Sequence, residues 1–152
     1  MRSVKVVKQG ARYTARHGGT RMYKRILVPL AYRPGHHPDA EIKAARAIAA
    51  PGAHITLLHV IGAVPEFRTE HATSGTALAE VVEHDLERIA EPFVEADVKV
   101  LQGDPAETIL NLASREAVDC IVLAPHRTHA GEYGSTAAQV VRRAPCTVHL
   151  VR

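Results

Sequence analysis

Residues 119–124 are Asp-Cys-Ile-Val-Leu-Ala, an apolar run that no alternating polar side chain interrupts. Strands that are buried on both faces have such runs, as in a parallel sheet covered by helices. Four more segments have the same β-rich character and are expected to be strands: residues 24–30 (KRILVPL), 54–61 (HITLLHVI), 97–101 (DVKVL) and 146–151 (CTVHLV). Residues 119–124 are therefore the fourth of five predicted strands.

Helical patterns separate the predicted strands. One apolar stripe at spacings of four and three residues predicts the second helix: Leu78, Val82, Leu86, Ile89 and Phe93. Asp104-Pro105-Ala106-Glu107 is close to a capping box and predicts a third helix that begins at Pro105. The full set of expected helices covers residues 38–50, residues 76–96, the segment from Pro105, and about residues 135–143. The order β-α-β-α-β-α-β-α-β predicts an α/β fold with a doubly wound parallel sheet and helices on both faces.

The charge of the chain divides at Met22. The 152 residues hold 19 Lys and Arg against 16 Asp and Glu, a formal charge of +3. Residues 1–21 carry six of these bases and no acid, so residues 22–152 have a net charge of −3. We expect a domain over 22–152, preceded over 1–21 by a basic extension that is disordered or lies upstream of the true start. A basic arm for an anionic partner, or a targeting segment, is the alternative for these 21 residues.

Composition argues against several functions. No apolar run approaches the roughly 20 residues of a membrane span. Aromatic residues make up 4% of the chain and Trp is absent, so a nucleic-acid stacking surface is not expected. Two cysteines are too few for a disulfide framework, and a reducing cytoplasm is the expected location. Ten histidines include two pairs in loops that follow strands, yet no cysteine lies there and a metal site is not expected: His36 and His37, His126 and His129.

Ligands of doubly wound sheets bind outside the carboxyl ends of the strands. There, Gly134-Ser135-Thr136 opens the last predicted helix, whose free N–H groups and hydroxyls suit a phosphate; an ordinary serine N-cap is the alternative. Arg127 is either a bidentate phosphate clamp or a solvated surface arginine. The chain contains no GxxxxGK[ST] loop, no GxGxxG and no G-x-S-x-G elbow, so we expect no catalytic residue.

The chain resembles the universal stress protein family over residues 22–152. The resemblance is carried by Tyr23-Lys24-Arg25-Ile26-Leu27-Val28-Pro29, by Leu57-Leu58-His59-Val60, by Gly103-Asp104-Pro105, and most specifically by the closing stretch from Gly134-Ser135-Thr136 to Leu150-Val151-Arg152. His126-Arg127 and Tyr133 are similar to the F/G-type subclass. The resemblance implies a five-stranded parallel sheet of order 3-2-1-4-5, an adenine-nucleotide α-hydrolase-like fold, and a homodimer that pairs through the last strand.

The resemblance also implies a site for ATP or AMP, with no metal beyond a nucleotide-associated Mg. Family ATP-binders place adenine near an Asp after the first strand and a valine of the second, and phosphates in a G-x2-G-x9-G-[ST] motif. Val60 and Gly134-Ser135 match these positions, whereas Ala31 replaces the Asp, and Ala124 and Arg127 replace the first two glycines. The complete set of expected site residues is Pro29, Ala31, Val60, Gly103, Leu123, Ala124, His126, Arg127, Gly134, Ser135 and Thr136.

The expected function is that of a small dimeric stress-response or regulatory module in the cytoplasm, with ATP or AMP bound at the carboxyl ends of strands one and four. Gly134-Ser135 and Arg127 favour this hypothesis, and His126-Arg127 would substitute cationic side chains for the missing glycine backbone. The alternative is a nucleotide-independent interaction module with a degenerate nucleotide site, which Ala31 and the lost glycines favour. Neither hypothesis includes an enzymatic step.

Overall fold

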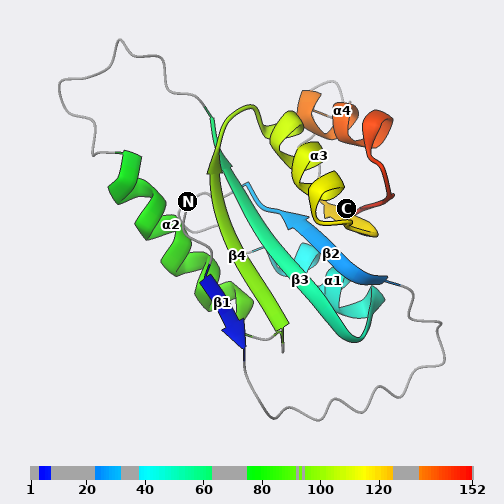
Figure 1. Ribbon diagram of the computed structural model, residues 1–152, viewed down its shortest axis with the longest axis horizontal. Coiled ribbons are helices and arrows are strands. Elements are labelled where there is room, and N and C mark those ends of the chain that lie inside the picture. Colours follow the sequence, from blue (N-terminus) through cyan, green and yellow to red (C-terminus); the bar gives the residue numbers. More distant parts are fainter. Residues whose placement is uncertain are drawn as a thin grey trace.

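One mixed sheet with helices on both faces organises the chain (Figure 1). The computed structural model describes residues 4–7, 23–31, 38–62, 75–91, 93, 95–124 and 134–151, with backbone only at 4–7 and 75–78. Within these residues the sheet order is β1-β4-β3-β2-β5-β6. The elements are β1 (Val4–Val7), β2 (Tyr23–Pro29), α1 (Asp39–Ile48), β3 (Ala49–Ile61), α2 (Gly75–Ala90), β4 (Glu95–Gln102), α3 (Pro105–Arg115), β5 (Cys120–Leu123), α4 (Ser135–Arg143) and β6 (Thr147–Leu150).

The five strands from β2 to β6 are mutually parallel and lie in the order β4-β3-β2-β5-β6. This is the predicted order 3-2-1-4-5, so the expected fold class is confirmed. The chain winds outward from β2 to β3 and β4, then returns to β5 on the other side of β2. The strand order therefore reverses between β2 and β5, which pair directly through Ile26↔Cys120 and Leu27↔Ile121.

The strand β1 was not expected from the sequence. It runs antiparallel to β4, with Val4 opposite Val98 and Lys5 opposite Asp97. Its sequence Val-Lys-Val-Val is rich in β-branched residues, which favour strands, and β4 offers an unpaired edge. These four residues belong to the basic extension over 1–21, which was expected to be disordered or to lie upstream of the true start. The rest of that segment lies outside the described residues.

Two helix ends also differ from the expectation. Helix α2 stops at Ala90 instead of residue 96, and β4 already begins at Glu95. The sequence has Pro92 here, which has no N–H for a helical hydrogen bond. The Phe93 N–H instead donates to the Ala90 carbonyl at 2.9 Å, and its ring is buried although it follows the helix. Helix α1 likewise ends at Ile48 instead of residue 50, and β3 begins at once.

Each face of the sheet has its own apolar core. Helices α1 and α2 cover one face, where Ala45, Val82 and Leu86 pack against Val28, Leu57 and other strand residues. Helices α3 and α4 cover the other face, where Ile109 and Val140 pack against Leu27, Leu58 and Ile121. Burial on both faces explains why the strands have continuous apolar runs instead of alternating ones. The two faces of the sheet are thus covered by helices, and the carboxyl and amino edges of its strands are the places where a ligand can reach the sheet.

Candidate functional site

The predicted site lies at the carboxyl edge of the sheet, around the point where the strand order reverses. The edge includes the ends of β2 and β3. Pro29 is buried and pairs with Leu58, whereas Ala31 is exposed and Val60 half-buried. The Leu30 N–H donates to the Leu58 carbonyl at 2.8 Å, and the ring Nδ1 of His59 lies 2.9 Å from the Leu30 carbonyl oxygen. The end of β2 is thus fixed by β3, and the small side chain of Ala31 offers no polar group to a ligand.

Gly103 forms the turn between β4 and α3. Its φ of +151° is a conformation that other residues rarely adopt, and an added Cβ would lie 2.9 Å from Thr108 Oγ1. The Gly103 N–H donates to the Ile61 carbonyl at 3.0 Å, which ties the ends of β3 and β4 together. The next residue, Asp104, is the N-cap of α3 and accepts from the Glu107 N–H at 2.9 Å, as the capping box predicted. Gly103 therefore shapes the edge through its backbone.

Helix α4 is the next described element of the chain after β5. Leu123 is buried at the last position of β5 and Ala124 follows it half-buried. Gly134 is the N-cap of α4 and no side chain caps the helix, so the alternative of a serine N-cap is wrong. Ser135 is instead the first helical residue and is exposed, with Thr136 half-buried behind it. The first N–H groups of a helix have no intrahelical partner, so this end attracts anions.

Several predicted residues fall outside the described part of the chain. These are His126 and Arg127 of the proposed phosphate clamp, the subclass residue Tyr133, and the histidines His36, His37 and His129. The described residues contain no group of three or more side chains that could hold a metal ion. The candidate site therefore rests here on Pro29, Ala31, Val60, Gly103, Leu123, Ala124, Gly134, Ser135 and Thr136, which the fold brings to one edge of the sheet.

Charged groups near this edge link α3 to α4. Arg143 of α4 forms an ion pair with Glu107 of α3, and its second nitrogen lies 3.2 Å from Glu107 Oε2. Hydrogen bonding to Arg143 lowers the pKa of the Glu107 carboxyl, and the same pair raises the pKa of Arg143. Both groups are exposed to solvent, so the pair contributes little to stability.

Cys120 begins β5 and Cys146 directly precedes β6, and the two belong to the cores on opposite faces of the sheet. Cys120 belongs to the core under α1 and α2, whereas Cys146 packs against the core under α3 and α4. Both thiols are free. Burial raises the pKa of Cys120 to about 12 and also raises that of Cys146, so neither is a ready thiolate at neutral pH. This arrangement agrees with two structural thiols.

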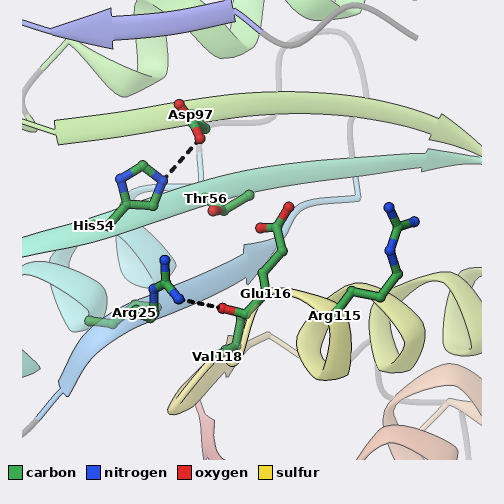
Figure 2. A pocket seen from close by; sticks show the side chains of 8 residues that line it. Arg25, His54, Thr56, Asp97, Arg115, Glu116 and Val118 are labelled. Atoms are coloured by element: carbon green, nitrogen blue, oxygen red, sulfur yellow. Dashed lines mark hydrogen bonds and ion pairs between the residues drawn. The ribbon is translucent and has the colours of Figure 1, made fainter.

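A cavity of about 350 Å³ lies at the opposite end of the sheet from the predicted site. Figure 2 shows Arg25, His54 and Thr56 rising from β2 and β3, with Asp97 on β4 and Arg115 and Glu116 at the end of α3. His54 Nε2 is 3.0 Å from Asp97 Oδ2, and Arg25 Nη1 donates to the Glu116 carbonyl at 3.0 Å. Lys99 forms an ion pair with the Glu116 carboxylate. Sequence reasoning missed this cavity.

A signal for the cavity is nevertheless present in the sequence. Three predicted strands begin with polar residues on the face that becomes apolar two residues later, as Arg25 precedes Leu27. Thr56 precedes Leu58 in the same way, and Lys99 precedes Leu101. Once β2, β3 and β4 are known to be neighbours, these polar starts must lie together at the amino edge.

Comparison with known proteins gives one consistent family. The model of the universal stress protein family matches residues 22–152. A universal stress protein of Methanothermobacter thermautotrophicus is 30% identical over 144 residues, which covers 86% of this chain and 97% of that protein. A universal stress protein in the QAH/OAS sulfhydrylase 3′ region of Thermus aquaticus is 35% identical over 144 residues, 86% of this chain and 100% of that protein.

Solved structures share the architecture. A hypothetical protein whose biochemical function was assigned from its structure superimposes with a TM-score of 0.71 at 25% identity, covering 86% of this chain and 96% of its own. A universal stress protein in complex with cAMP has a TM-score of 0.61 at 20% identity, covering 86% and 97%. One from Archaeoglobus fulgidus in complex with dAMP has a TM-score of 0.54 at 17% identity, covering 86% and 98%. These likenesses agree with the adenine-nucleotide α-hydrolase-like fold class.

Proposed function

The chain belongs to the universal stress protein family, and from this premise we propose that it is a small regulatory module that binds an adenine nucleotide, ATP or AMP, at the carboxyl edge of its sheet. The nucleotide phosphates would lie at the start of α4, and the base would lie near Val60 at the end of β3. The function assigns no hydrolytic step to the site, and any Mg would arrive with the nucleotide.

The uncapped start of α4 carries this proposal. Gly134 places no side chain over the helix end and no side chain caps it, so the N–H groups of the first turn are left for a ligand. An anion there gains from the partial positive charge of the helix terminus and from hydrogen bonds that the helix cannot make itself. Adenine nucleotides bound by similarly folded chains supply the ligand class.

The test is calorimetric titration of the full chain with ATP and AMP, using Ser135→Glu. Glutamate in the first turn favours a helix, so the protein should keep its stability while the carboxylate repels a phosphate. We expect the affinity for ATP to fall at least about tenfold. Arg142→Gln is the matched control, because it makes the same change in net charge at the exposed far end of α4. Equal affinity in all three proteins would exclude this site.

A second candidate function is nucleotide-independent interaction through the last strand. Within the described residues β6 pairs only with β5, and its outer edge is open. Val148 and Leu150 are half-buried on this edge strand, which suits a second copy of the chain. Light scattering tests this homodimer: the wild type should be dimeric at tens of micromolar protein, and Val148→Lys should be monomeric. A monomeric wild type would count against it.

The proposal also covers the cellular location of the protein and the boundary of its folded domain. In the part of the chain that the structure describes, no helix is long and apolar enough to cross a membrane. We place the protein in the cytoplasm, where two free thiols remain reduced. The match of the family model from residue 22 onward supports a folding domain over 22–152, with residues 1–21 as an appendage.

A further inference from the structure

The cavity at the amino edge lies on the sheet face that α3 and α4 cover further along. On that face Leu27 and Leu58 are fully buried, whereas Arg25 and Thr56 precede them by two residues on β2 and β3 and line the cavity. Helix α3 ends at Arg115, and Val118 closes one wall as the chain turns back towards β5. The result is a polar floor of three strands beyond the last turn of α3.

Thr56 is the first indication of a ligand. Its residue is only 2% exposed, and among the described residues no partner for its hydroxyl is found. The side chain lines the cavity beside His54 and Asp97 (Figure 2). The hydroxyl oxygen is not among the enclosed polar atoms that lack a partner, so it is accessible from the cavity, where a polar group of a ligand can form a hydrogen bond with it. Valine has nearly the same shape and would fill this position without offering the cavity a hydroxyl.

The charges around the cavity leave an excess on the positive side. Asp97 is paired with His54, and the Glu116 carboxylate is paired with Lys99. Arg25 donates one hydrogen bond to the Glu116 carbonyl at the end of α3, where the helix dipole is negative. The guanidinium of Arg25 forms no ion pair with a described residue, so its other N–H groups can bind a ligand. Arg115 at the rim also forms no ion pair with a described residue. The cations Arg25, Lys99 and Arg115 outnumber the carboxylates of Asp97 and Glu116 by one, and the two cations without an ion pair to a described residue are both guanidinium groups.

From this arrangement we propose that the amino-edge cavity binds a small oxyanion, a phosphate or carboxylate group, held by Arg25 and the Thr56 hydroxyl and attracted by Arg115. Guanidinium presents parallel N–H groups that match the oxygen spacing of both anions. The volume of about 350 Å³ is at the lower end of ligand pockets, which fits a compact molecule. The site is separate from the nucleotide site, which lies at the other end of the same strands.

The experiment is an NMR titration of the full chain with inorganic phosphate and, separately, with succinate. We expect the amide of Thr56 and the side-chain Nε of Arg25 to shift with saturation in the millimolar range, while the amides of Gly134 and Ser135 follow a different curve. The anion that saturates at lower concentration distinguishes a phosphate source from a carboxylate source. Absence of a shift at Thr56 with both anions overturns the proposal.

Variants with opposite expected signs separate binding from a structural role. Arg25→Gln should lower the affinity for the anion about tenfold or more, and Arg115→Gln should lower that affinity less. Glu116→Gln should raise the affinity for the anion, because it removes a competing carboxylate and frees Lys99 from its ion pair. Arg46→Gln, exposed on α1 over the other face, is the matched control and should change nothing. Reversed signs would identify a cation site and overturn the proposal.

Thr56→Val gives a readout that does not depend on the anion's charge. The variant should bind phosphate several times more weakly and yet melt at nearly the same temperature as the wild type without ligand, because the hydroxyl has no hydrogen bond to a described residue that could be lost. A clear loss of melting temperature would mean that the hydroxyl already has a structural partner, and the assignment of Thr56 would be wrong.

Discussion

The two ends of the sheet use different chemistry. At the carboxyl edge the described positions are small or apolar, such as Ala31 and Gly134, and the groups on offer are backbone N–H groups at the start of α4. At the amino edge the strands begin with charged and hydroxyl side chains, such as Arg25 and Thr56. The same strands, β2 and β3, contribute to both ends. The comparison shows that a backbone site is created by topology, whereas a side-chain site requires particular residues.

This difference also decides how each end tolerates mutation. A backbone site is lost when a helix start or a glycine turn is distorted, even if no side chain touches the ligand. A side-chain site loses affinity in proportion to the charges removed, while the fold stays intact. Three changes of decreasing effect test this contrast.

The largest effect is expected at the shared core. Leu27 is fully buried on β2 between the two edges, so Leu27→Ala should lower the free energy of unfolding by about 2–5 kcal/mol. Both edges should be affected together, since both depend on the same strand. Urea unfolding followed by circular dichroism measures the loss. Val81→Ala, at a position that is 57% exposed, is the control and should change stability by less than about 0.5 kcal/mol.

A change confined to the carboxyl edge should have an intermediate effect. Gly103→Ala places a Cβ against Thr108 Oγ1 in a backbone conformation that alanine disfavours, so the free energy of unfolding should fall by about 1–3 kcal/mol. Gly62→Ala is the matched control, because its Cβ would meet open space and its φ lies outside the positive range. Equal losses in the two variants would show that the turn is not strained. Phosphate binding at the amino edge should survive Gly103→Ala.

The smallest effect is expected from removal of residues 1–21. Strand β1 pairs with the amino half of β4, so the deletion should accelerate hydrogen exchange of the edge amides at residues 95–98. Residues 134–137 should exchange as before, and the melting temperature should change little. Slower or unchanged exchange at 95–98 would indicate that β1 does not cover this edge in solution. The deletion should therefore change hydrogen exchange near the amino edge and leave it unchanged at the start of α4.

Local signals in the sequence predicted much of this fold. The capping box at Asp104 and the last helix over 135–143 agree with the structure because each depends on residues within one turn. The end of α2 was misjudged because Phe93 continues the apolar stripe, although Pro92 interrupts the helical hydrogen bonds. The strand β1 was missed because its four residues lie in a basic, glycine-containing segment and depend on a distant partner strand.

The candidate sites show the same division. The carboxyl edge was predicted because strand order alone places the ends of β2 and β5 together. The alternative of a serine N-cap for α4 is wrong by one residue, since glycine also favours that position. The amino-edge cavity was missed because its residues come from four separated segments, and a polar residue at one strand start carries no signal by itself. Only the register of β2, β3 and β4 unites them.

The central claim is that the two ends of the sheet bind different ligands independently. The most direct test titrates ATP and inorganic phosphate into Ser135→Glu and Arg25→Gln and follows the amides of Ser135 and Thr56 by NMR. The account predicts that Ser135→Glu loses ATP binding and keeps the phosphate response at Thr56, while Arg25→Gln does the reverse. Loss of both responses in either stably folded variant, or of neither in both, would contradict it.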